Sequence, residues 1–369
     1  MRKLCCIVGA RPNFMKIAPI MRQLTKRGEN IDAMLIHTGQ HYDEAMNSLF
    51  FQQLAIPTPD VHLEVGSSSH AIQTADIMRR FEPVIDKEDP NAILVVGDVN
   101  STIACSLVAA KKGVRIIHVE AGLRSFDRTM PEEINRILTD QLSDLLFITE
   151  KDAEDNLNAE GIPSNKIHFV GNVMIDTLLH TLNKTENETV ILQKHNITLP
   201  SINNNYGLVT MHRPSNVDDP EILHGLLETL NLISEKIPLI FPVHPRTAQR
   251  IHNAKLNVIL NKGHITAMEP LGYLELLGLM RHAKLVLTDS GGIQEETTAL
   301  GVPCITLREN TERPITLTQG TNTLVGTDRK KILEVADDTL KNGGKTGRIP
   351  DAWDGHAAER IVEIINDWL

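Results

Sequence analysis

Three acidic side chains stand where predicted strands end or predicted helices begin. Asp98 and Glu120 come directly after apolar runs that we predict to be strands, and Glu132 lies in the first turn of a predicted helix. A carboxyl group beside a buried strand can exchange a proton with a ligand, because burial shifts its pKa toward neutral values. Asp98 could instead cap the next helix, and Glu132 could complement a helix dipole. We favour acid–base chemistry, with Arg136 orienting Glu132 from four residues further along the helix.

A glycine-rich turn in the second half of the chain has the form of a phosphate-binding loop. In Thr288–Glu296 a predicted strand ends, Ser290, Gly291 and Gly292 follow, and a helix begins. Glycines let the backbone approach a ligand closely, and the N–H groups at a helix start favour an anion. Glu296, about one turn into that helix, is placed to accept hydrogen bonds from ribose hydroxyls. The alternative is an ordinary Gly-Gly turn with acidic residues at a helix start.

Basic side chains follow other predicted strands. Arg11 and Lys16 lie at the start of the first predicted helix, and Arg308 and Arg313 lie in the loop after the run Cys304–Leu307. In an acidic chain, basic groups at these points favour an anionic ligand such as a diphosphate. The alternative, solvated charges at a helix start and in a loop, carries about equal weight for each segment taken alone.

His212 and Arg213 also follow a predicted strand. A lone histidine is more often a satisfied structural residue than a functional one. Because this histidine adjoins an arginine at a strand end, proton transfer or phosphate contact is a reasonable role for it.

We predict no metal site. His37 and His41 are four residues apart, but they lack the glutamate of the zinc-protease helix motif and lie in a glycine-containing turn. His118 and Cys304 fit part of a zinc deaminase signature, but Leu307 stands where its second cysteine would be.

The composition narrows the class of protein. The chain has 369 residues, of which 41% are hydrophobic and 23% charged, enough for the cores of about two domains. A net charge of −10 and an aromatic content of 4% argue against nucleic-acid binding and against an anionic membrane surface as a partner. No apolar stretch reaches the roughly 18 residues of a membrane span, and the N-terminal run is too short for a signal peptide. We therefore expect a cytoplasmic protein.

Short apolar runs, each followed by a polar turn and a helix-length segment, indicate parallel strands covered on both faces. We predict an α/β protein with two halves, divided by a polar, Asn-rich connector at 183–206. Apolar residues at helical spacing in Ala357–Leu369 predict a C-terminal helix that docks on another part of the chain. Since ligands of open parallel sheets bind outside the carboxyl ends of the strands, two such halves would form a cleft between them. The predicted strands are Leu4–Val8, Ala33–His37, Ile93–Val96, Ile116–Val119, Leu145–Ile148, His168–Val170, Leu208–Met211, Leu239–Val243, Leu285–Thr288 and Cys304–Leu307.

Taken together, these segments resemble the non-hydrolysing UDP-N-acetylglucosamine 2-epimerases. The matching stretches follow the family order over nearly the whole chain, and they are specific as a set although no single motif is decisive. They are Gly9–Lys16, Thr38–His41, Gly97-Asp98, His118–Arg124, Pro131–Arg136, Gly171-Asn172, His212–Pro214, Thr288–Glu296 and Thr311–Pro314.

The resemblance implies the GT-B fold, an α/β architecture of two Rossmann-like domains whose parallel sheets face a cleft. It places the first domain, which carries the catalytic carboxylates, at 1–172, with the C-terminal helix 357–369 docked on it. It places the second domain, which binds UDP, at 173–356.

The activity implied by the resemblance is the interconversion of UDP-N-acetylglucosamine and UDP-N-acetylmannosamine, with no cofactor and no metal. The resemblance also suggests a homodimer and a role in making precursors of bacterial or archaeal surface polysaccharides. It matches the catalytic groups to Asp98, Glu120, Glu132 and His212. It matches contacts with the phosphates or the intermediate to Arg11, Lys16, Arg136, Arg213, Ser290, Gly291, Gly292 and Arg313, and the ribose contact to Glu296. Gln40 and His41 resemble part of the site where bacterial members bind a second, activating UDP-N-acetylglucosamine.

Three departures from the family pattern leave the sugar open. Asn13 stands where many members have glutamate, Leu276 stands where an aromatic residue near the uracil is frequent, and Gly97–Asn100 replaces a threonine-rich run. Related substrates are 2,3-diacetamido uronic acid and 6-deoxy acetamido sugar nucleotides. The other hypotheses are a hydrolysing 2-epimerase, a GT-B glycosyltransferase and a non-catalytic sensor. Buried acids argue against the sensor, because their desolvation costs several kcal/mol unless they are paired.

Overall fold

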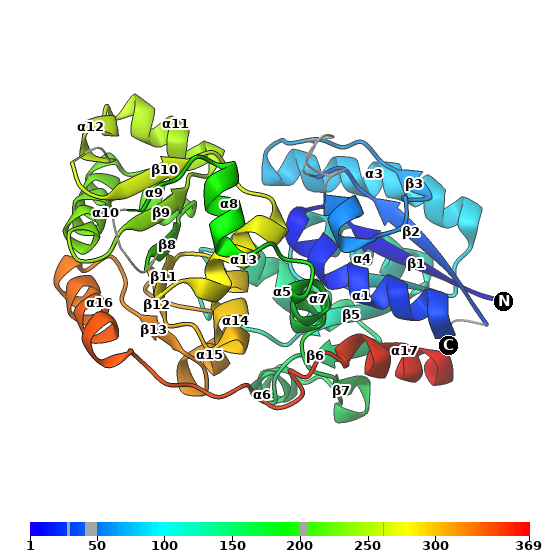
Figure 1. Ribbon diagram of the computed structural model, residues 1–369. Coiled ribbons are helices and arrows are strands. Elements are labelled where there is room, and N and C mark those ends of the chain that lie inside the picture. The colour runs from blue at the N-terminus through cyan, green and yellow to red at the C-terminus, as the bar shows by residue number, and fades with distance from the viewer. Residues whose placement is uncertain (28–29, 41–49, 200–204, 261) are drawn as a thin grey trace. The chain divides into compact units, whose positions relative to one another are not determined.

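Two α/β units make up the described chain. The structure, a computed structural model, describes residues 1–27, 30–40, 50–199, 205–260 and 262–369. Contacts group Met1–His180 with Asp351–Leu369 as unit 1, and Thr181–Pro350 as unit 2. In each unit a parallel sheet is packed against helices (Figure 1).

Unit 1 is built on a seven-stranded parallel sheet. The strand order is β3-β2-β1-β4-β5-β6-β7, so the direction of the order reverses between β1 and β4. In this register Cys6 pairs with Leu35 on one side and with Leu94 on the other. The strands are β1 (Arg2–Val8), β2 (Ile31–His37), β3 (Val61–His62), β4 (Ala92–Val96), β5 (Arg115–Ala121), β6 (Leu145–Ile148) and β7 (Ile167–Phe169).

Unit 2 repeats this plan with a six-stranded parallel sheet. Its order is β10-β9-β8-β11-β12-β13, with the reversal between β8 and β11. One apolar core lies between the sheet and helices α10 and α16, and a second lies between the other face and helices α8, α13 and α14. The strands are β8 (Gly207–Thr210), β9 (Leu239–Pro242), β10 (Ile265–Met268), β11 (Leu285–Thr288), β12 (Cys304–Thr306) and β13 (Asn322–Leu324).

Local sequence explains where many helices begin and end. Proline occupies the first position of α5, α9, α10, α11 and α15, where its missing N–H has no intrahelical partner to lose. Asp219 and Asp328 accept hydrogen bonds from the first N–H groups of α10 and α16. The helices of unit 1 are α1 (Arg11–Arg27), α3 (His70–Glu88), α4 (Asn100–Lys112), α5 (Pro131–Leu142), α6 (Asp152–Ala159), the 3-10 helix Ser164–Lys166, α7 (Val173–Leu182, which ends in unit 2) and α17 (Ala357–Trp368). Those of unit 2 are α8 (Glu188–Lys194), α9 (Pro214–Val217), α10 (Pro220–Ser234), α11 (Pro245–Asn253), α12 (Asn257–Leu260), α13 (Tyr273–His282), α14 (Gly291–Leu300), α15 (Pro314–Thr318) and α16 (Arg329–Asn342).

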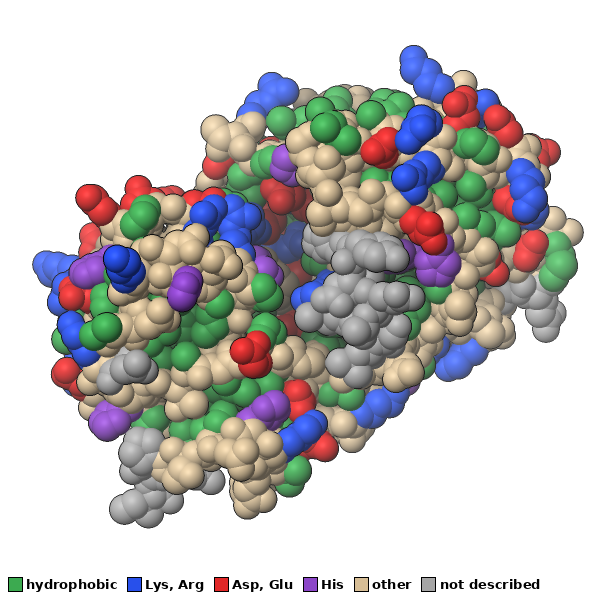
Figure 2. All heavy atoms as spheres, turned by 90° about the horizontal axis from the view of Figure 1, so that it is seen from above, with side chains coloured by type: hydrophobic (Ala, Val, Ile, Leu, Met, Phe, Trp, Pro, Cys, Tyr) green, Lys and Arg blue, Asp and Glu red, His purple; other side chains and the backbone are tan. Residues whose placement is uncertain are grey.

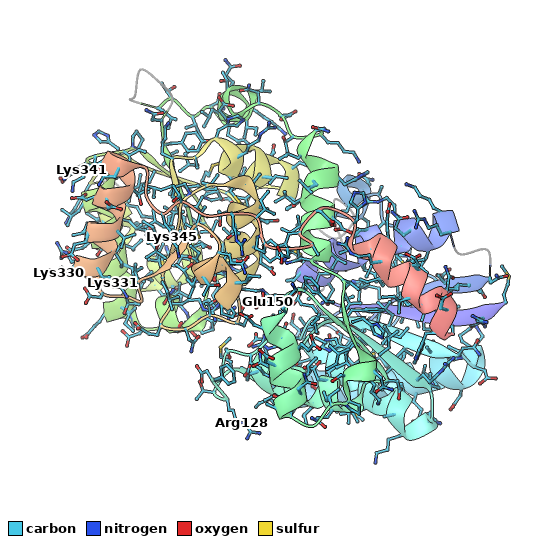
Figure 3. All side chains as sticks on the ribbon, turned by 90° about the horizontal axis from the view of Figure 1, so that it is seen from below. Arg128, Glu150, Lys330, Lys331, Lys341 and Lys345 are labelled. Carbon is cyan, nitrogen blue, oxygen red and sulfur yellow. The ribbon has the colours of Figure 1, made fainter. Side chains whose placement is uncertain are left out.

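Helix α16 illustrates the amphipathic pattern of these helices. Ile332 and Ala336 are buried against the sheet, whereas Lys330, Lys331 and Lys341 are exposed on the outer side (Figure 3). On the face of the molecule seen in Figure 2, acidic and basic side chains are interspersed rather than gathered by sign.

The predicted α/β class with parallel sheets is confirmed, and every predicted strand overlaps an observed one. Three strands were not predicted: β3, β10 and β13. Each lies at an edge of its sheet and is only partly buried, so it lacks the apolar run that marks a strand covered on both faces. The connector predicted at 183–206 contains α8, which packs on α13 within unit 2.

The C-terminal helix α17 docks on α1 within unit 1 (Figure 1). Asp176, on α7, is buried and accepts hydrogen bonds from Ala357 N at 3.1 Å and Ala358 N at 2.7 Å, so it caps the first turn of α17. Burial raises the pKa of Asp176, although these two N–H groups oppose that shift. Trp353, in the segment before α17, is buried and donates to the Thr149 carbonyl at 3.2 Å.

These contacts explain why the units divide at His180 and Pro350 rather than at 172 and 356. Most of α7 belongs to unit 1 because Asp176 holds α17 and Thr177 donates to the Met15 carbonyl of α1 at 2.6 Å. The segment before α17 belongs there because of Trp353. None of the helices in the described part of the chain has the length and apolar character needed to cross a membrane.

We predict that Asp176→Ala lowers the free energy of unfolding by about 1–2 kcal/mol, because it removes the cap of a helix start. Asp176→Asn keeps one acceptor oxygen and should lose less. Urea unfolding measures both effects, and hydrogen exchange should show lost amide protection concentrated in α17. Unchanged protection of α17 in Asp176→Ala would contradict the capping role.

Candidate active site

The turns that follow β1 and β4 lie side by side in unit 1, because these strands pair where the strand order reverses. Asn13 joins the two turns. Its Oδ1 accepts from Gly9 N at 3.3 Å and Ala10 N at 3.1 Å, and its Nδ2 donates to the Val96 carbonyl at 2.9 Å. Such a reversal point is where open parallel sheets bind ligands. The asparagine noted above as a departure therefore has a structural role at this edge.

Lys16 and Glu120 form a buried ion pair beside these turns. Lys16 comes from α1 and Glu120 from β5, they are 5% and 2% exposed, and Nζ lies 2.6 Å from Oε1. Gly97 leaves room for the pair, because a Cβ at this position would lie 2.6 Å from Nζ of Lys16. Glu120 has a φ of +74° and lies at an irregularity of β5, a strained geometry that occurs preferentially at functional sites. Arg11, at the start of α1, is half-buried, and its guanidinium lies 5.9 Å from the centre of the Phe50 ring.

Arg136 joins two carboxylates of unit 1. It is 2% exposed and donates to Asp98, in the turn after β4, and to Glu133 at 2.8 Å. Burial alone would raise the pKa of Glu133, but N–H groups of the backbone and the Arg136 guanidinium lower it below the ordinary value. Glu132, the expected partner of Arg136, is half-buried in the first turn of α5. Arg136 pairs with Glu133 instead, because both side chains lie on the buried side of α5.

A second buried network lies behind these groups. His118 and Asp140 are fully buried, with His118 Nδ1 2.6 Å from Asp140 Oδ1 and His118 Nε2 2.9 Å from the Gly97 carbonyl oxygen. Both ring nitrogens of His118 thus face oxygen atoms that can accept a hydrogen bond. Arg124 also donates to Asp140, at 2.7 Å. Burial alone would raise the pKa of Asp140, but the charges and hydrogen bonds of His118 and Arg124 lower it below the ordinary value.

In unit 2, Asp289 holds the turn that follows β8. This buried carboxylate, at the end of β11, accepts from His212 N at 2.9 Å and Arg213 N at 2.8 Å, and lies 3.1 Å from His212 Nδ1. Burial raises its pKa, but the His212 ring and these N–H groups lower it below the ordinary value. The turns of His212 and Ser290 thus meet at the second reversal point, between β8 and β11.

Ser290, Gly291 and Gly292 lie at the N-terminus of α14. Ser290 is the N-cap residue, and its N–H donates to Thr288 Oγ1 at 3.0 Å. Gly291 begins the helix with Glu312 so close that an added Cβ would lie 2.5 Å from its Oε1. A helix start with this glycine pair can bind an anion through its N–H groups.

Glu296, further along α14, is 4% exposed and accepts from the Tyr273 hydroxyl at 3.0 Å. Burial and the neighbouring Glu295 raise the pKa of Glu296 to about 7, although the Tyr273 hydrogen bond opposes this. Arg313 is buried in the loop before α15, and its Nε lies 3.0 Å from Oε1 of Glu295. The predicted residues of the second half of the chain therefore gather in unit 2 around β8, β11 and α14.

The residues that sequence reasoning missed are the charged partners of those it found. They are Glu133, Asp140, Asp289, Glu295 and Glu312, and His118 was considered only as a metal ligand. For the four acidic residues in helices or loops the sequence gives only a weak signal of a site, because an acidic residue at such a position is usually solvated. For Asp289 the position at the end of an apolar strand is a usable signal, as it was for Glu120.

The predicted activator residues lie apart from these contacts. Gln40 is buried, and its Oε1 accepts from Ser101 N at 3.0 Å and Ser101 Oγ at 2.7 Å. His41 lies outside the described residues, so activator binding stays a prediction. Within the described chain, no cluster of three or more His, Cys, Asp or Glu side chains could hold a metal ion.

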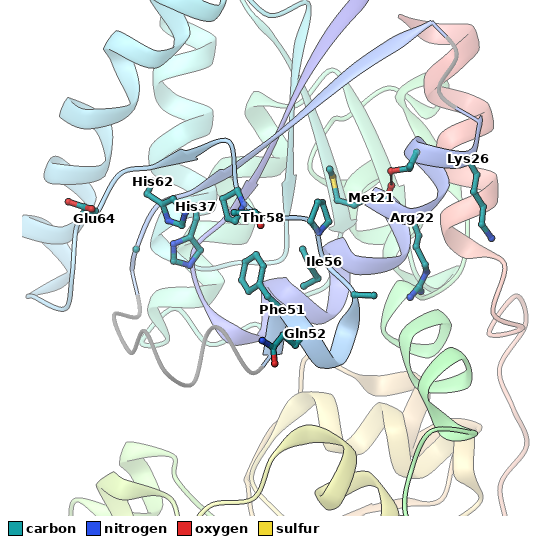
Figure 4. A pocket seen from close by; sticks show the side chains of 15 residues that line it. Met21, Arg22, Lys26, His37, Phe51, Gln52, Ile56, Thr58, His62 and Glu64 are labelled. Carbon is teal, nitrogen blue, oxygen red and sulfur yellow. Dashed lines mark hydrogen bonds between the residues drawn. The ribbon is translucent and has the colours of Figure 1, made fainter.

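A cavity of about 980 Å³ lies elsewhere in unit 1, between α1 and the segment 51–59 (Figure 4). Arg22, His37, Phe51 and Ile56 are among its lining residues. Burial, with a smaller effect of His62, lowers the pKa of His37 to about 4, so its ring is neutral. The described lining contains none of the predicted catalytic or substrate-binding residues.

Comparisons with known proteins agree over the whole chain. A family model described as UDP-N-acetylglucosamine 2-epimerase matches residues 23–366. The chain is 44% identical to the UDP-N-acetylglucosamine 2-epimerase of Methanococcus maripaludis, over 99% of this chain and 98% of the relative. It is 40% identical to the UDP-2,3-diacetamido-2,3-dideoxy-D-glucuronate 2-epimerase of Pseudomonas aeruginosa, over 98% of this chain and 99% of the relative. The crystal structure of Methanocaldococcus jannaschii UDP-GlcNAc 2-epimerase in complex with UDP-GlcNAc and UDP matches with a TM-score of 0.91 and 43% identity, over 99% of each chain.

We predict that Lys16→Met lowers the free energy of unfolding by about 3–5 kcal/mol, because it leaves the buried Glu120 carboxylate without its cation. The double variant Lys16→Met/Glu120→Gln should recover more than about 1 kcal/mol of that loss. Urea unfolding of the single and double variants completes the cycle. Lys3→Met, which breaks the less deeply buried pair with Glu88, is the control and should lower the free energy of unfolding much less. Simple additivity of the two substitutions would contradict a coupled pair.

We predict that Glu296→Gln raises the free energy of unfolding at pH 8 relative to its effect at pH 5. The difference between the two effects should be about 1–3 kcal/mol. A carboxyl whose folded pKa is raised to about 7 favours folding at low pH, and this contribution is lost as the pH rises through 7. Glutamine removes that dependence and keeps an acceptor for Tyr273. Glu275→Gln should behave oppositely, because Lys194 and His195 lower the pKa of Glu275 against the effect of burial. Urea unfolding at both pH values measures the difference, and an equal effect at pH 5 and pH 8 would disprove the assigned cause.

Proposed function

Because the chain belongs to the UDP-N-acetylglucosamine 2-epimerase family, we propose that it interconverts UDP-N-acetylglucosamine and UDP-N-acetylmannosamine. The observation that carries the proposal is full-length identity of 44% to an archaeal relative of that name. The carboxylates, basic side chains and glycine-rich helix start that follow strands of the two sheets support it. In this proposal unit 1 supplies the catalytic carboxylates and unit 2 binds the uridine diphosphate.

The proposed reaction is elimination followed by re-addition. A base takes the proton from C2, the C1–O bond to UDP breaks, and 2-acetamidoglucal forms. UDP stays bound, its oxygen adds back to C1, and C2 receives a proton on the opposite face. The numbers of protons and electron pairs balance over the cycle, and the reaction needs a base, an acid and cations for the departing diphosphate.

Asp98, Glu120 and Glu132 are the proposed acids and bases of unit 1. Pairing supports this role for the first two, because Lys16 and Arg136 hold their carboxylates at fixed positions. We propose that Arg11, Lys16 and Arg136 also contact the phosphates or the intermediate.

The proposed groups of unit 2 are His212 for proton transfer, Glu296 for the ribose, and the N-terminus of α14 for the diphosphate. The contact of Asp289 with His212 Nδ1 supports the first assignment, since it leaves Nε2 as the nitrogen available to a ligand. The free N–H groups expected at a helix start support the third. Further phosphate contacts in this proposal are Arg213, Ser290, Gly291, Gly292 and Arg313.

A second candidate substrate is a UDP-linked 2,3-diacetamido uronic acid. The relative of Pseudomonas aeruginosa named for that substrate is 40% identical over almost all of both chains, so the sequence separates the two substrates only narrowly. A uronate adds a carboxylate to the sugar, and the two substrates can be tested side by side.

We propose further that the protein works in the cytoplasm, as a homodimer, to supply precursors of surface polysaccharides. The homodimer and the biosynthetic role rest on the family resemblance alone. Light scattering coupled to size-exclusion chromatography tests the dimer.

We predict that the protein converts UDP-N-acetylglucosamine in heavy water to UDP-N-acetylmannosamine, with deuterium appearing at C2 and little free UDP. Asp98→Asn should lower the rate by about 10²- to 10⁴-fold, the usual contribution of a positioned acid or base. Proton NMR follows both changes. Glu228→Gln, on α10, removes an arginine-paired carboxylate outside the candidate site and should leave the rate near that of the parent.

Other outcomes of the same experiment assign the other hypotheses. Stoichiometric free N-acetylmannosamine and UDP would identify a hydrolysing epimerase. Turnover of the diacetamido uronate alone would identify the second substrate, and failure with both would leave a GT-B glycosyltransferase or a non-catalytic sensor as the better hypothesis.

A further inference from the structure

Glu312 is a buried carboxylate surrounded by arginines. It lies in the loop before α15, is 5% exposed, and its Oε2 lies 2.7 Å from Arg308 Nη2. Arg213 Nη2 lies 3.7 Å from its Oε1, and Arg313 is the adjacent residue in the chain. Burial would raise the pKa of Glu312, but Arg308, Arg313 and Arg213 hold it far below the ordinary value, so the group is an anion.

The same carboxylate lies against the N-terminus of α14. Only glycine at 291 permits this approach, because a Cβ there would lie 2.5 Å from Oε1 of Glu312. The start of a helix attracts negative charge through its exposed N–H groups. Glu312 therefore combines two features of a bound phosphate, contact with a helix N-terminus and arginine partners.

We propose that Glu312 is an internal counter-anion that stands in for the diphosphate in the ligand-free protein and competes with it for Arg213, Arg308 and Arg313. This inference rests on the proposed function, which places the diphosphate at the same helix start. Without Glu312, the guanidinium groups of Arg213 and Arg308 would lose a carboxylate partner until a diphosphate binds. With it, binding of a diphosphate is opposed by a carboxylate that already occupies the site.

The consequence for turnover is easier release of the nucleotide. A fixed anion beside the diphosphate raises the free energy of the bound state, so it weakens binding of both UDP-sugars and favours their dissociation. Its removal should lower KM, and it should lower kcat wherever release limits the rate. A residue that only held the arginines in position would have the opposite effect on affinity, because its loss would misplace the groups that contact the phosphates.

The test is calorimetric titration of UDP and uridine into the parent protein and Glu312→Gln, with thermal unfolding of each. We expect Glu312→Gln to bind UDP about tenfold more tightly, because the substitution removes a negative charge that repels the diphosphate. Uridine, which has no phosphate, should bind both proteins equally. The ligand-free variant should unfold at a lower temperature, and UDP should raise that temperature more than it does for the parent.

Two further variants make the result specific. Glu312→Asp keeps the charge and should bind UDP within about twofold of the parent. Glu228→Gln removes an arginine-paired carboxylate on α10, outside the candidate site, and should leave UDP binding unchanged. If the parent protein binds UDP and Glu312→Gln binds it equally or more weakly, the counter-anion role alone is overturned. Failure of the parent protein to bind UDP at all would overturn the proposed function together with this inference.

Discussion

The carboxylate of Asp140 is the group on which the functional edge of unit 1 depends. It is fully buried, and it accepts hydrogen bonds from His118, from Gly122 N at 3.1 Å and from Arg124. All three donors lie in the last part of β5 and the turn after it. A buried carboxylate that lost these donors would be destabilised by several kcal/mol, so the whole segment is held against α5 as one piece. Glu120 lies within this segment, which explains how a glutamate keeps a φ of +74°, a conformation that costs about 1–3 kcal/mol. Through its other nitrogen His118 also holds the carbonyl of Gly97, so the position of Asp98 depends on the same carboxylate.

Unit 2 solves the same problem with a different aspartate. Asp289 is contributed by a strand rather than a helix, but it too is buried and accepts hydrogen bonds from consecutive backbone N–H groups of the neighbouring turn. The turn held by Asp289 follows β8 at the reversal point of its sheet, whereas the turn held by Asp140 follows β5, next to the reversal between β1 and β4. Such turns have few backbone partners of their own, since the parallel ladder ends before them. One buried carboxylate supplies those partners and fixes the turn without adding a further element of secondary structure.

Much of this arrangement could be predicted from the sequence, because strand ends and helix starts leave local signals. Glu120, Ser290 and Glu296 were found from an apolar run followed by a polar residue or a glycine turn, and the buried strands were found in the same way. Asp140 could not be found, because a single aspartate inside an amphipathic helix reveals its role only when the helix is packed on β5. The expected pairing of Arg136 with Glu132 followed from helical spacing, whereas the side of α5 that is buried decides in favour of Glu133. The edge strands and the end of unit 1 within α7 also depend on tertiary contacts, so local sequence does not predict them.

The charges at the candidate site follow one rule in both units. Two of the carboxylates proposed to exchange protons in unit 1 are each held by a cation, Glu120 by Lys16 and Asp98 by Arg136. The imidazole proposed to do so in unit 2 is held by an anion, Asp289. A fixed partner of opposite charge keeps the direction of each side chain, because the partner is itself buried and held by the surrounding residues. The partners are cationic in unit 1 and anionic in unit 2 because each one has the charge opposite to that of the side chain it anchors.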